Sequence, residues 1–295
     1  TGTSVDRRCY FKVVYHYLLR GYDPALKPGR SWDEFSTRTE PYIAVWRQHP
    51  DQCMAAWKKW KHSAEGLLSE PVGTEPPFVV PLLPASRAKH VWRFLTQGIP
   101  YKMRLCLDLK ATGVNEATQD WKFRYRDLYD VAARLQRTDW LASVDISRFY
   151  LRLAAGMGLR RVQWVQDPTT YGSDVTTNKG KSGRKWRQLQ AIGFGLKTAP
   201  AWASVVSAEL VRIFEAAGVR VLGCFIDDIL IAGASEKECR QALDRALEIM
   251  SELGLPANDK TEGPMSPQQG IVFLGVHIEP ARMRFRVSAE HREYA

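Results

Sequence analysis

Two short apolar runs, each interrupted by acidic residues, stand out in the pattern of hydrophobic and polar positions. The run at 221–233 reads VLGCFIDDILIAG, with Asp227 and Asp228 at its centre. Runs of this length that are rich in Val, Ile and Phe are typical of buried strands. Because an unpartnered buried carboxylate costs several kcal/mol, the pattern predicts a hairpin turn whose two acids are either solvated or hold a metal ion.

The second run, at 140–153, reads WLASVDISRFYLRL and contains Asp145, followed by Phe149 and Tyr150. A pair of aspartates in a turn is weak evidence for a metal site when it stands alone, since such turns are often only solvated. Another acid in a matching strand strengthens the interpretation. Three carboxylates on neighbouring strands could bind two magnesium ions.

The remaining pattern alternates helices and strands. Helical spacing and capping signals predict helices at 5–21, 40–48, 51–68 with Asp51 as its cap, 126–135, 199–217 and 235–253 with a Ser235–Glu238 capping box. Extended patterns predict strands at 101–109, 160–166, 185–190, 271–278 and 283–287, with a basic hairpin at 177–185. This order favours an α+β fold, in which helices cover one face of an antiparallel sheet. Asp145 and the Asp227–Asp228 turn would then be neighbours.

Composition and charge limit the domain organisation and the kinds of partner that the chain can have. With 295 residues, 45% of them hydrophobic, the chain can bury a core as one large domain or two packed subdomains. The net charge of +10 favours a polyanionic partner, although structural RNA binders share this property. Basic residues at 58–62 fit either a solvated helix face or a patch that binds a nucleic-acid backbone.

The cysteines and the apolar stretches bear on location. The five cysteines are isolated, which argues against a zinc site or a disulfide framework and favours a reducing, intracellular compartment, cytoplasmic or nuclear. No stretch is long enough to span a membrane, so no membrane partner is expected. Thr1 is not a natural start, which suggests a piece of a longer protein.

Six stretches occur in the order found in reverse transcriptases of retroelements, and the chain resembles that family from about 76 to 287. They are RLCLDLKATGVN from Arg104, SVDISRFYLRL from Ser143, GFGLKTAP from Gly193, FIDDILIAG from Phe225, LGLPANDKTEGP from Leu253 and FLGVHI from Phe273. The helix after GFGLKTAP, the GVRVLGCFIDD segment and GYDPAL most resemble DIRS-type elements, which transpose with a tyrosine recombinase. Ty3-like retrotransposons are the next best match.

The resemblance implies a right-hand polymerase fold. Fingers and a palm are expected, with an antiparallel palm sheet backed by helices. The implied domains are a helical N-terminal extension at 1–70, fingers at 71–140, a palm at 141–270 with a fingers hairpin at about 160–192, and primer-grip strands with the start of a thumb at 271–295. The implied activity is RNA-directed and DNA-directed DNA polymerase. The alternative is a catalytically silent, domesticated domain that serves as a structural or RNA-binding subunit.

The family's site residues transfer where the motifs match. Asp145, Asp227 and Asp228, with Ile146, would hold two Mg²⁺ ions, with Mn²⁺ as a substitute, and Lys260 would protonate or shield the leaving pyrophosphate. The implied nucleotide-binding residues are Lys102, Arg104, Phe149, Tyr150, Phe194 and Gly195, with Tyr150 stacked under the deoxyribose. The implied primer grip is Phe273, Leu274 and Gly275. The blander alternative is that the basic residues are surface charges and the aromatic residues belong to the core.

The resemblance also implies partners: an RNA or DNA template with its primer, deoxynucleoside triphosphates, and further domains or subunits that supply a thumb and ribonuclease H. Three positions depart from the family's pattern. Phe225 replaces a frequent Tyr, Gly193 replaces a frequent Pro, and Phe149 replaces a small residue beside the implied sugar site.

Overall fold

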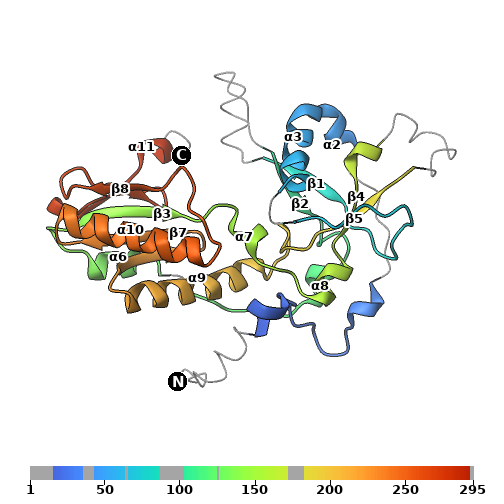
Figure 1. Ribbon diagram of the computed structural model, residues 1–295, viewed down its shortest axis with the longest axis horizontal. Coiled ribbons are helices and arrows are strands. Elements are labelled where there is room, and N and C mark those ends of the chain that lie inside the picture. Colours follow the sequence, from blue (N-terminus) through green and yellow to red (C-terminus); the bar gives the residue numbers. More distant parts are fainter. Residues whose placement is uncertain are drawn as a thin grey trace. The chain divides into compact units, whose positions relative to one another are not determined.

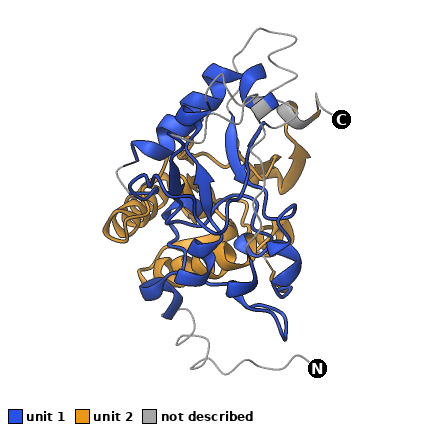
Figure 2. Cartoon of the chain, turned by 90° about the vertical axis from the view of Figure 1, so that its right-hand side faces the viewer, with its two compact units in different colours: residues 1–121, 150–199 blue, residues 122–149, 200–295 orange. Residues whose placement is uncertain are grey.

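The structure is a computed structural model that describes residues 16–35, 43–63, 66–86, 103–124, 126–171 and 183–292 (Figure 1). The chain forms two compact units (Figure 2). Unit 1 comprises 1–121 and 150–199, and unit 2 comprises 122–149 and 200–295. The units are interleaved along the sequence, because the chain passes from one to the other three times.

Unit 1 is built on two antiparallel strand pairs. β1 (Leu82–Ala85) pairs with β2 (Arg104–Leu107), and β4 (Trp164–Gln166) pairs with β5 (Trp186–Gln188). The helical elements are η1 (Trp32–Glu34), α2 (Ile43–Gln48), α3 (Pro50–Lys61), α5 (Val114–Ala117), α8 (Met157–Arg161) and η2 (Pro168–Thr170). Helix α7 (Phe149–Arg152) begins at the last residue of the first segment of unit 2 and continues into unit 1. The region at about 160–192, predicted as a fingers hairpin, contains the β4–β5 pair, and residues 172–182 within it, which include most of the predicted basic hairpin, lie outside the described residues.

Several predicted elements of unit 1 have different bounds. Helix α3 begins at Pro50 with His49 as its N-cap, so Asp51 is not the cap, and it ends at Lys61 rather than at 68. The strand predicted to begin at 160 starts only at Trp164, because 157–161 is helix α8. Of the helix predicted at 5–21, only 16–21 is described, and 16–20 is helical.

Unit 2 contains a four-stranded antiparallel sheet with the order β6-β7-β3-β8. The strands are β3 (Trp140–Asp145), β6 (Arg220–Phe225), β7 (Asp228–Gly233) and β8 (Glu262–Met265). Helix α10 (Glu236–Glu252) packs against β7, β3 and β8, while α6 (Leu128–Arg134) packs against β6. Helix α9 (Ala199–Ala216) precedes β6 (Figure 1). The predicted antiparallel sheet with accompanying helices is therefore present in this unit.

A second sheet of unit 2 has the order β11-β10-β9, with β9 at Ile271–Phe273, β10 at Val276–Glu279 and β11 at Arg284–Val287. The single strand predicted at 271–278 is wrong, because the chain turns at Leu274 and Gly275, whose φ angles are 50° and 78°. Positive φ at both central residues is the geometry that tight hairpins favour. The short elements η3 (Pro280–Arg282) and α11 (Ala289–Arg292) complete the described part.

The core of unit 2 joins its two sheets. A buried cluster takes residues from α6 and from strands of both sheets: Val131, Leu135, Leu141, Leu222, Leu230, Ala232, Ile271, Phe273 and Ile278. Helix α10 begins as predicted, since Ser235 Oγ accepts a hydrogen bond from the Glu238 amide at 3.2 Å. This packing holds the ends of the central strands in fixed positions. No helix among the described residues combines the length and apolar character needed to cross a bilayer.

Candidate active site

The three acids predicted to act together are brought to one end of the unit 2 sheet. Strands β3 and β7 pair so that Asp145 lies directly opposite Asp228. Asp227 precedes Asp228 in the two-residue turn between β6 and β7, since Phe225 pairs with Asp228. Directly opposed residues in antiparallel strands have Cβ atoms about 4.5–5.5 Å apart. The prediction that Asp145 and the turn are neighbours is confirmed.

The turn is also tied to strand β3 by the main chain. The amide of Ile146 donates a hydrogen bond of 2.9 Å to the carbonyl oxygen of Asp227. Ile146 is 1% exposed, so this bond is shielded from water. The side chain of Ile146 therefore has a structural role, and only its main chain is available to a ligand at this end of the sheet.

Asp145 is nearly buried, at 6% exposed, and both of its carboxylate oxygens have partners. Lys260 Nζ lies 3.1 Å from Oδ2, and the side-chain amide of Asn258 donates to Oδ1. Asn258 also accepts a hydrogen bond of 2.7 Å from the Lys260 amide, and its own amide donates to the Asp145 carbonyl at 3.0 Å. Asn258 therefore fixes both the acid and the lysine. It is a site residue that the sequence pattern missed.

The donor type at this end of the sheet fits magnesium. Carboxylate and carbonyl oxygens are the hard ligands that Mg²⁺ prefers. Among the described residues, however, no three or more His, Cys, Asp or Glu side chains are gathered into a finished metal site. The acids are thus adjacent through strand register but do not already form a complete ligand shell. Nearby, burial raises the pKa of Cys224 to about 12, so its neutral thiol adds no charge.

In unit 1, three of the predicted nucleotide-binding residues lie together. The Tyr150 and Phe194 rings have centroids 5.3 Å apart, and the Arg104 guanidinium lies 5.8 Å from the Phe194 centroid. Arg104 is exposed on β2, and Tyr150 is half-buried. Lys102 lies outside the described residues. The arrangement presents a cation and two aromatic rings, which suits a nucleotide.

Gly195 is required by the local backbone. Its φ is 107°, and a Cβ at this position would collide with the carbonyl oxygen of Leu107. The approach is close because the Leu107 amide donates a 2.7 Å hydrogen bond to the carbonyl of Phe194. Asn115 holds the same segment, donating to the Gly195 carbonyl at 2.8 Å and accepting from the Lys197 amide at 2.9 Å. These bonds explain how Phe194 is placed beside β2.

Phe149 and the residues of the predicted primer grip lie apart from the two groups described above. Phe149 is 2% exposed, so its ring is not open to a ligand, and of the two adjacent aromatic residues only Tyr150 has an accessible ring. The predicted primer grip forms the β9–β10 hairpin of unit 2, in which Phe273 is 1% exposed and belongs to the core. The turn residues Leu274 and Gly275 are half-buried, and Leu274 packs against the core cluster.

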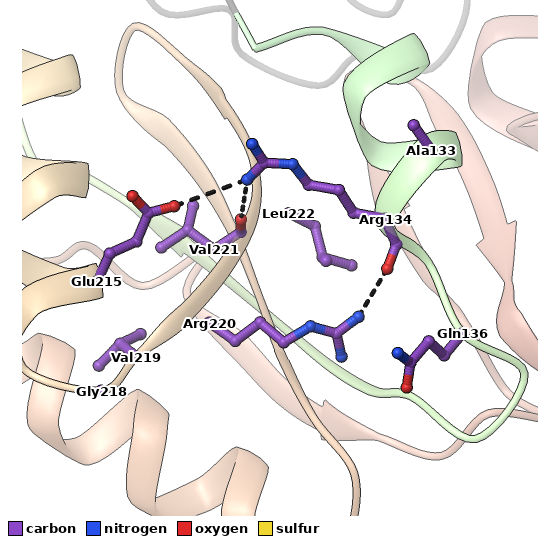
Figure 3. A pocket seen from close by; sticks show the side chains of 9 residues that line it. All are labelled: Ala133, Arg134, Gln136, Glu215, Gly218, Val219, Arg220, Val221 and Leu222. Carbon is purple, nitrogen blue, oxygen red and sulfur yellow. Dashed lines mark hydrogen bonds and ion pairs between the residues drawn. The ribbon is translucent and has the colours of Figure 1, made fainter.

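A cavity of about 600 Å³ lies at the opposite end of β6 from the acids (Figure 3). Its arginines already have partners. Arg134 donates to the Val221 carbonyl at 3.4 Å and lies 3.6 Å from Glu215, and Arg220 pairs with the fully buried Asp139 at 2.6 Å. The lining reaches Leu222, and Phe225 pairs with Asp228, so about 10 Å of strand separates the cavity from the acids. The cavity is therefore separate from the acidic site.

Comparison with known proteins defines the class. The family described as reverse transcriptase (RNA-dependent DNA polymerase) matches residues 92–278, more than half of the chain. The protein therefore belongs to the reverse transcriptase family, a family of nucleotidyltransferases.

A relative is found in Caenorhabditis elegans, the uncharacterized protein K02A2.6. It is 25% identical to this chain over 181 residues, which cover 61% of the chain and 12% of that protein. The chain therefore spans only a small part of the length of that relative.

Proposed function

We propose that the chain is an active RNA-directed and DNA-directed DNA polymerase that works by two-metal nucleotidyl transfer. One observation carries the proposal: Asp145 lies opposite Asp228 in the β3–β7 register, with Asp227 in the adjoining turn. A silent scaffold has no physical need to keep three acidic residues at one end of a sheet. In this proposal unit 2 is the palm, and the β1–β2 and β4–β5 pairs of unit 1 belong to the fingers.

The reaction joins a primer 3′-oxygen to the α-phosphorus of a deoxynucleotide and releases pyrophosphate. Two magnesium ions, when bound, neutralise the charge that develops at the phosphorus and at both of its reacting oxygens. The chain's own part is to hold and orient. Asp145, Asp227 and Asp228 supply the anionic ligands, and Asn258 fixes the orientation of Asp145. Lys260 Nζ, exposed and held beside Asp145, donates a proton or a hydrogen bond to the leaving pyrophosphate.

Unit 1 contributes nucleotide binding. Arg104 presents a guanidinium for the triphosphate, and charge-assisted hydrogen bonds of this kind are about twice as strong as neutral ones. The ring of Tyr150 lies under the sugar, where it obstructs a 2′-hydroxyl. The template and its primer bind through the basic surface that the net charge of +10 reflects.

The finer assignment belongs to the same proposal. The segments GFGLKTAP, GVRVLGCFIDD and GYDPAL support a DIRS-type retroelement, with the Ty3-like group as the alternative. Other domains or subunits would then supply a thumb and ribonuclease H. The length of the Caenorhabditis elegans relative beyond the matched region is compatible with this larger assembly.

The decisive experiment is primer extension on an RNA template with magnesium and deoxynucleotides. We expect the double variant Asp227→Asn, Asp228→Asn to lose at least about 10³-fold of the activity, because several kcal/mol of charge stabilisation depend on the metal ligands. The matched control is Asp244→Asn on the exposed face of α10, which removes a carboxylate far from the turn and should keep full activity. Extension that needs no magnesium, or equal extension by the double variant, would disprove the proposal.

A further inference from the structure

The direction of the Asp227 side chain is set by the two peptide groups that flank its Cα atom. The carbonyl of the following peptide, that of Asp227 itself, is held by the Ile146 amide at 2.9 Å. The carbonyl of the preceding peptide, that of Ile226, accepts a hydrogen bond of 2.5 Å from Ser207 Oγ. With both peptide planes held, the Cα–Cβ bond of Asp227 has one orientation.

The preceding peptide needs this support because its backbone is strained. Ile226 has a φ of 56°. A two-residue hairpin turn favours positive φ at its first central position, where glycine is the usual residue. For a β-branched residue this region is a genuine outlier, and such conformations persist only where the surroundings hold them. A hydrogen bond to the Ile226 carbonyl is a contact of the kind that can hold this conformation.

The position of Ser207 allows this contact. It lies on α9 and is 1% exposed. Its hydroxyl has two carbonyl oxygens within reach, that of Ala203 one turn earlier at 2.8 Å and that of Ile226 at 2.5 Å. A hydroxyl has one proton to donate. The Ala203 carbonyl lies within the helix, where main-chain amides also serve as donors, whereas the bond to Ile226 joins the helix to the turn.

We propose that Ser207 is a positioning residue for the nucleotidyl transfer reaction: it holds the Ile226–Asp227 peptide in its strained conformation and thereby aims the Asp227 carboxylate at the metal. The inference rests on the proposed function, because it assigns Asp227 as a ligand. Ser207 itself touches neither substrate nor metal. Its effect passes through the turn.

The same helix provides a matched control. Ser204 lies three residues earlier on α9 and is 8% exposed. Its hydroxyl donates to the Pro200 carbonyl at 2.6 Å, and the structure shows no bond from it to the turn. Ser204→Ala therefore removes a comparable buried helix hydroxyl, whereas Ser207→Ala also removes the bond to Ile226. Because Ser207 also has a side-chain hydrogen bond with Cys224 on β6, a difference between the two variants measures the contacts of Ser207 with the turn and with the strand that leads into it.

The experiment compares Ser207→Ala, Ser204→Ala and Ser207→Thr in the full chain. For Ser207→Ala we expect a 10–100-fold fall in kcat with an unchanged KM for primer-template, since misplacement of about 1 Å can cost about 10²-fold in rate. The magnesium concentration for half-maximal rate should rise, and calorimetry should show the same loss of magnesium affinity. Ser204→Ala should stay within about twofold of the wild type. Ser207→Thr retains the hydroxyl and should restore most of the rate.

Amide hydrogen exchange of the peptide covering 225–228 provides a readout that does not need activity. Exchange should rise in Ser207→Ala and stay unchanged in Ser204→Ala. Equal exchange and equal magnesium affinity in the two alanine variants would overturn the inference. A wild type that neither binds magnesium nor extends a primer would instead overturn the proposed function. In that case the exchange data would still show whether Ser207 holds the turn.

Discussion

At the scale of single residues, the proposed function assigns the choice of nucleotide to the aromatic cluster of unit 1. The rings of Tyr150 and Phe194 meet at an interplanar angle of 56°, and Tyr150 keeps part of its surface exposed. A ribose differs from a deoxyribose by one hydroxyl group. A ring placed under C2′ excludes that hydroxyl by its bulk, whereas it leaves the deoxyribose in place.

Tyr150→Ala should admit ribonucleotides. We expect the ratio of ribonucleotide to deoxynucleotide kcat/KM to rise by about 10–100-fold, which corresponds to removing an interaction worth about 1–3 kcal/mol. Deoxynucleotide incorporation should fall only moderately. Tyr150→Phe is the control, because it keeps the ring and should keep the discrimination. A folded Tyr150→Ala enzyme that still rejects ribonucleotides would assign the discrimination to another side chain.

The residues that sequence predicted and those it missed differ in how they act. Asp145 and Asp227 were predictable because a carboxylate inside an apolar strand pattern conflicts with burial, and that conflict is visible in the sequence. Asn258 and Ser207 show no such conflict. Both are ordinary polar residues whose importance comes from hydrogen bonds to partners 113 and 19 residues away. Only the folded chain reveals these partners.

At the scale of elements, β5 and η2 are joined by a buried ion pair. Arg187 Nε lies 2.9 Å from Asp167 Oδ2, and the two side chains are 11% and 2% exposed. Burial alone would raise the pKa of Asp167, but hydrogen bonds from Arg187 and Thr169 outweigh it and lower the pKa below its usual value. The ionised pair therefore stabilises the fold at neutral pH, and this stability is lost as the pH falls through the lowered pKa.

Arg187→Met should destabilise the protein by about 3–5 kcal/mol at pH 7, because it leaves a buried carboxylate without its cation. The difference from wild type should already narrow as the pH falls toward about 4, because burial raises the pKa of Asp167 once Arg187 is gone, and it should narrow further below about 4 as the wild-type pair is lost. Urea unfolding at several pH values measures this. Arg161→Met is the control, since it breaks an exposed pair with Asp33 and should cost at most about 1 kcal/mol. Equal costs for the two variants would contradict the expectation.

The incorrectly predicted elements were also determined by tertiary contacts. Residues 157–161 form α8 because the Asp23 carboxylate accepts hydrogen bonds from the amides of Gly158 at 3.2 Å and Leu159 at 2.6 Å. A residue more than 130 positions away thus caps the helix, and the local pattern there resembles a strand. Helix α10 was predicted correctly because its cap, Ser235, is the residue immediately before the helix. Local signals were sufficient only where the stabilising partner was also local.

At the scale of the whole molecule, the net charge is +10, and the helices differ in whether their basic residues form ion pairs with acidic residues. On α10, Arg240 and Arg245 pair with Glu236 and Glu248. On α3, the basic residues are all exposed, and none forms an ion pair with another described residue: Lys58, Lys59, Lys61 and His62. The three lysines at this helix end, which have no ion-pair partner among the described residues, suit a phosphate backbone, and their charges also interact favourably with the helix dipole.

Replacing Lys58, Lys59 and Lys61 by Ala should weaken primer-template binding and reduce the slope of log K against log salt. The magnitude of this negative slope decreases by about 0.9 for each phosphate that the protein no longer neutralises, so the loss of three phosphate contacts would decrease it by about 2.7. The control replaces Lys237, Arg240 and Arg245 on α10, which changes the net charge equally. Filter binding at several salt concentrations gives both slopes. Equal changes in the two triple variants would mean that the lysines of α3 act only through net charge.

The interleaving of the two units affects how the protein folds during its synthesis. Strand β3 occupies the middle of the unit 2 sheet, yet its partners β7 and β8 follow it by about 80 and 120 residues. Translation at about 5–20 residues per second leaves β3, an almost wholly buried strand, without either neighbour for several seconds or longer. Unit 1, by contrast, has its last segment once residue 199 has been made. The unit 2 sheet of a nascent chain therefore cannot form around β3 until the hairpin that carries the acids has left the ribosome.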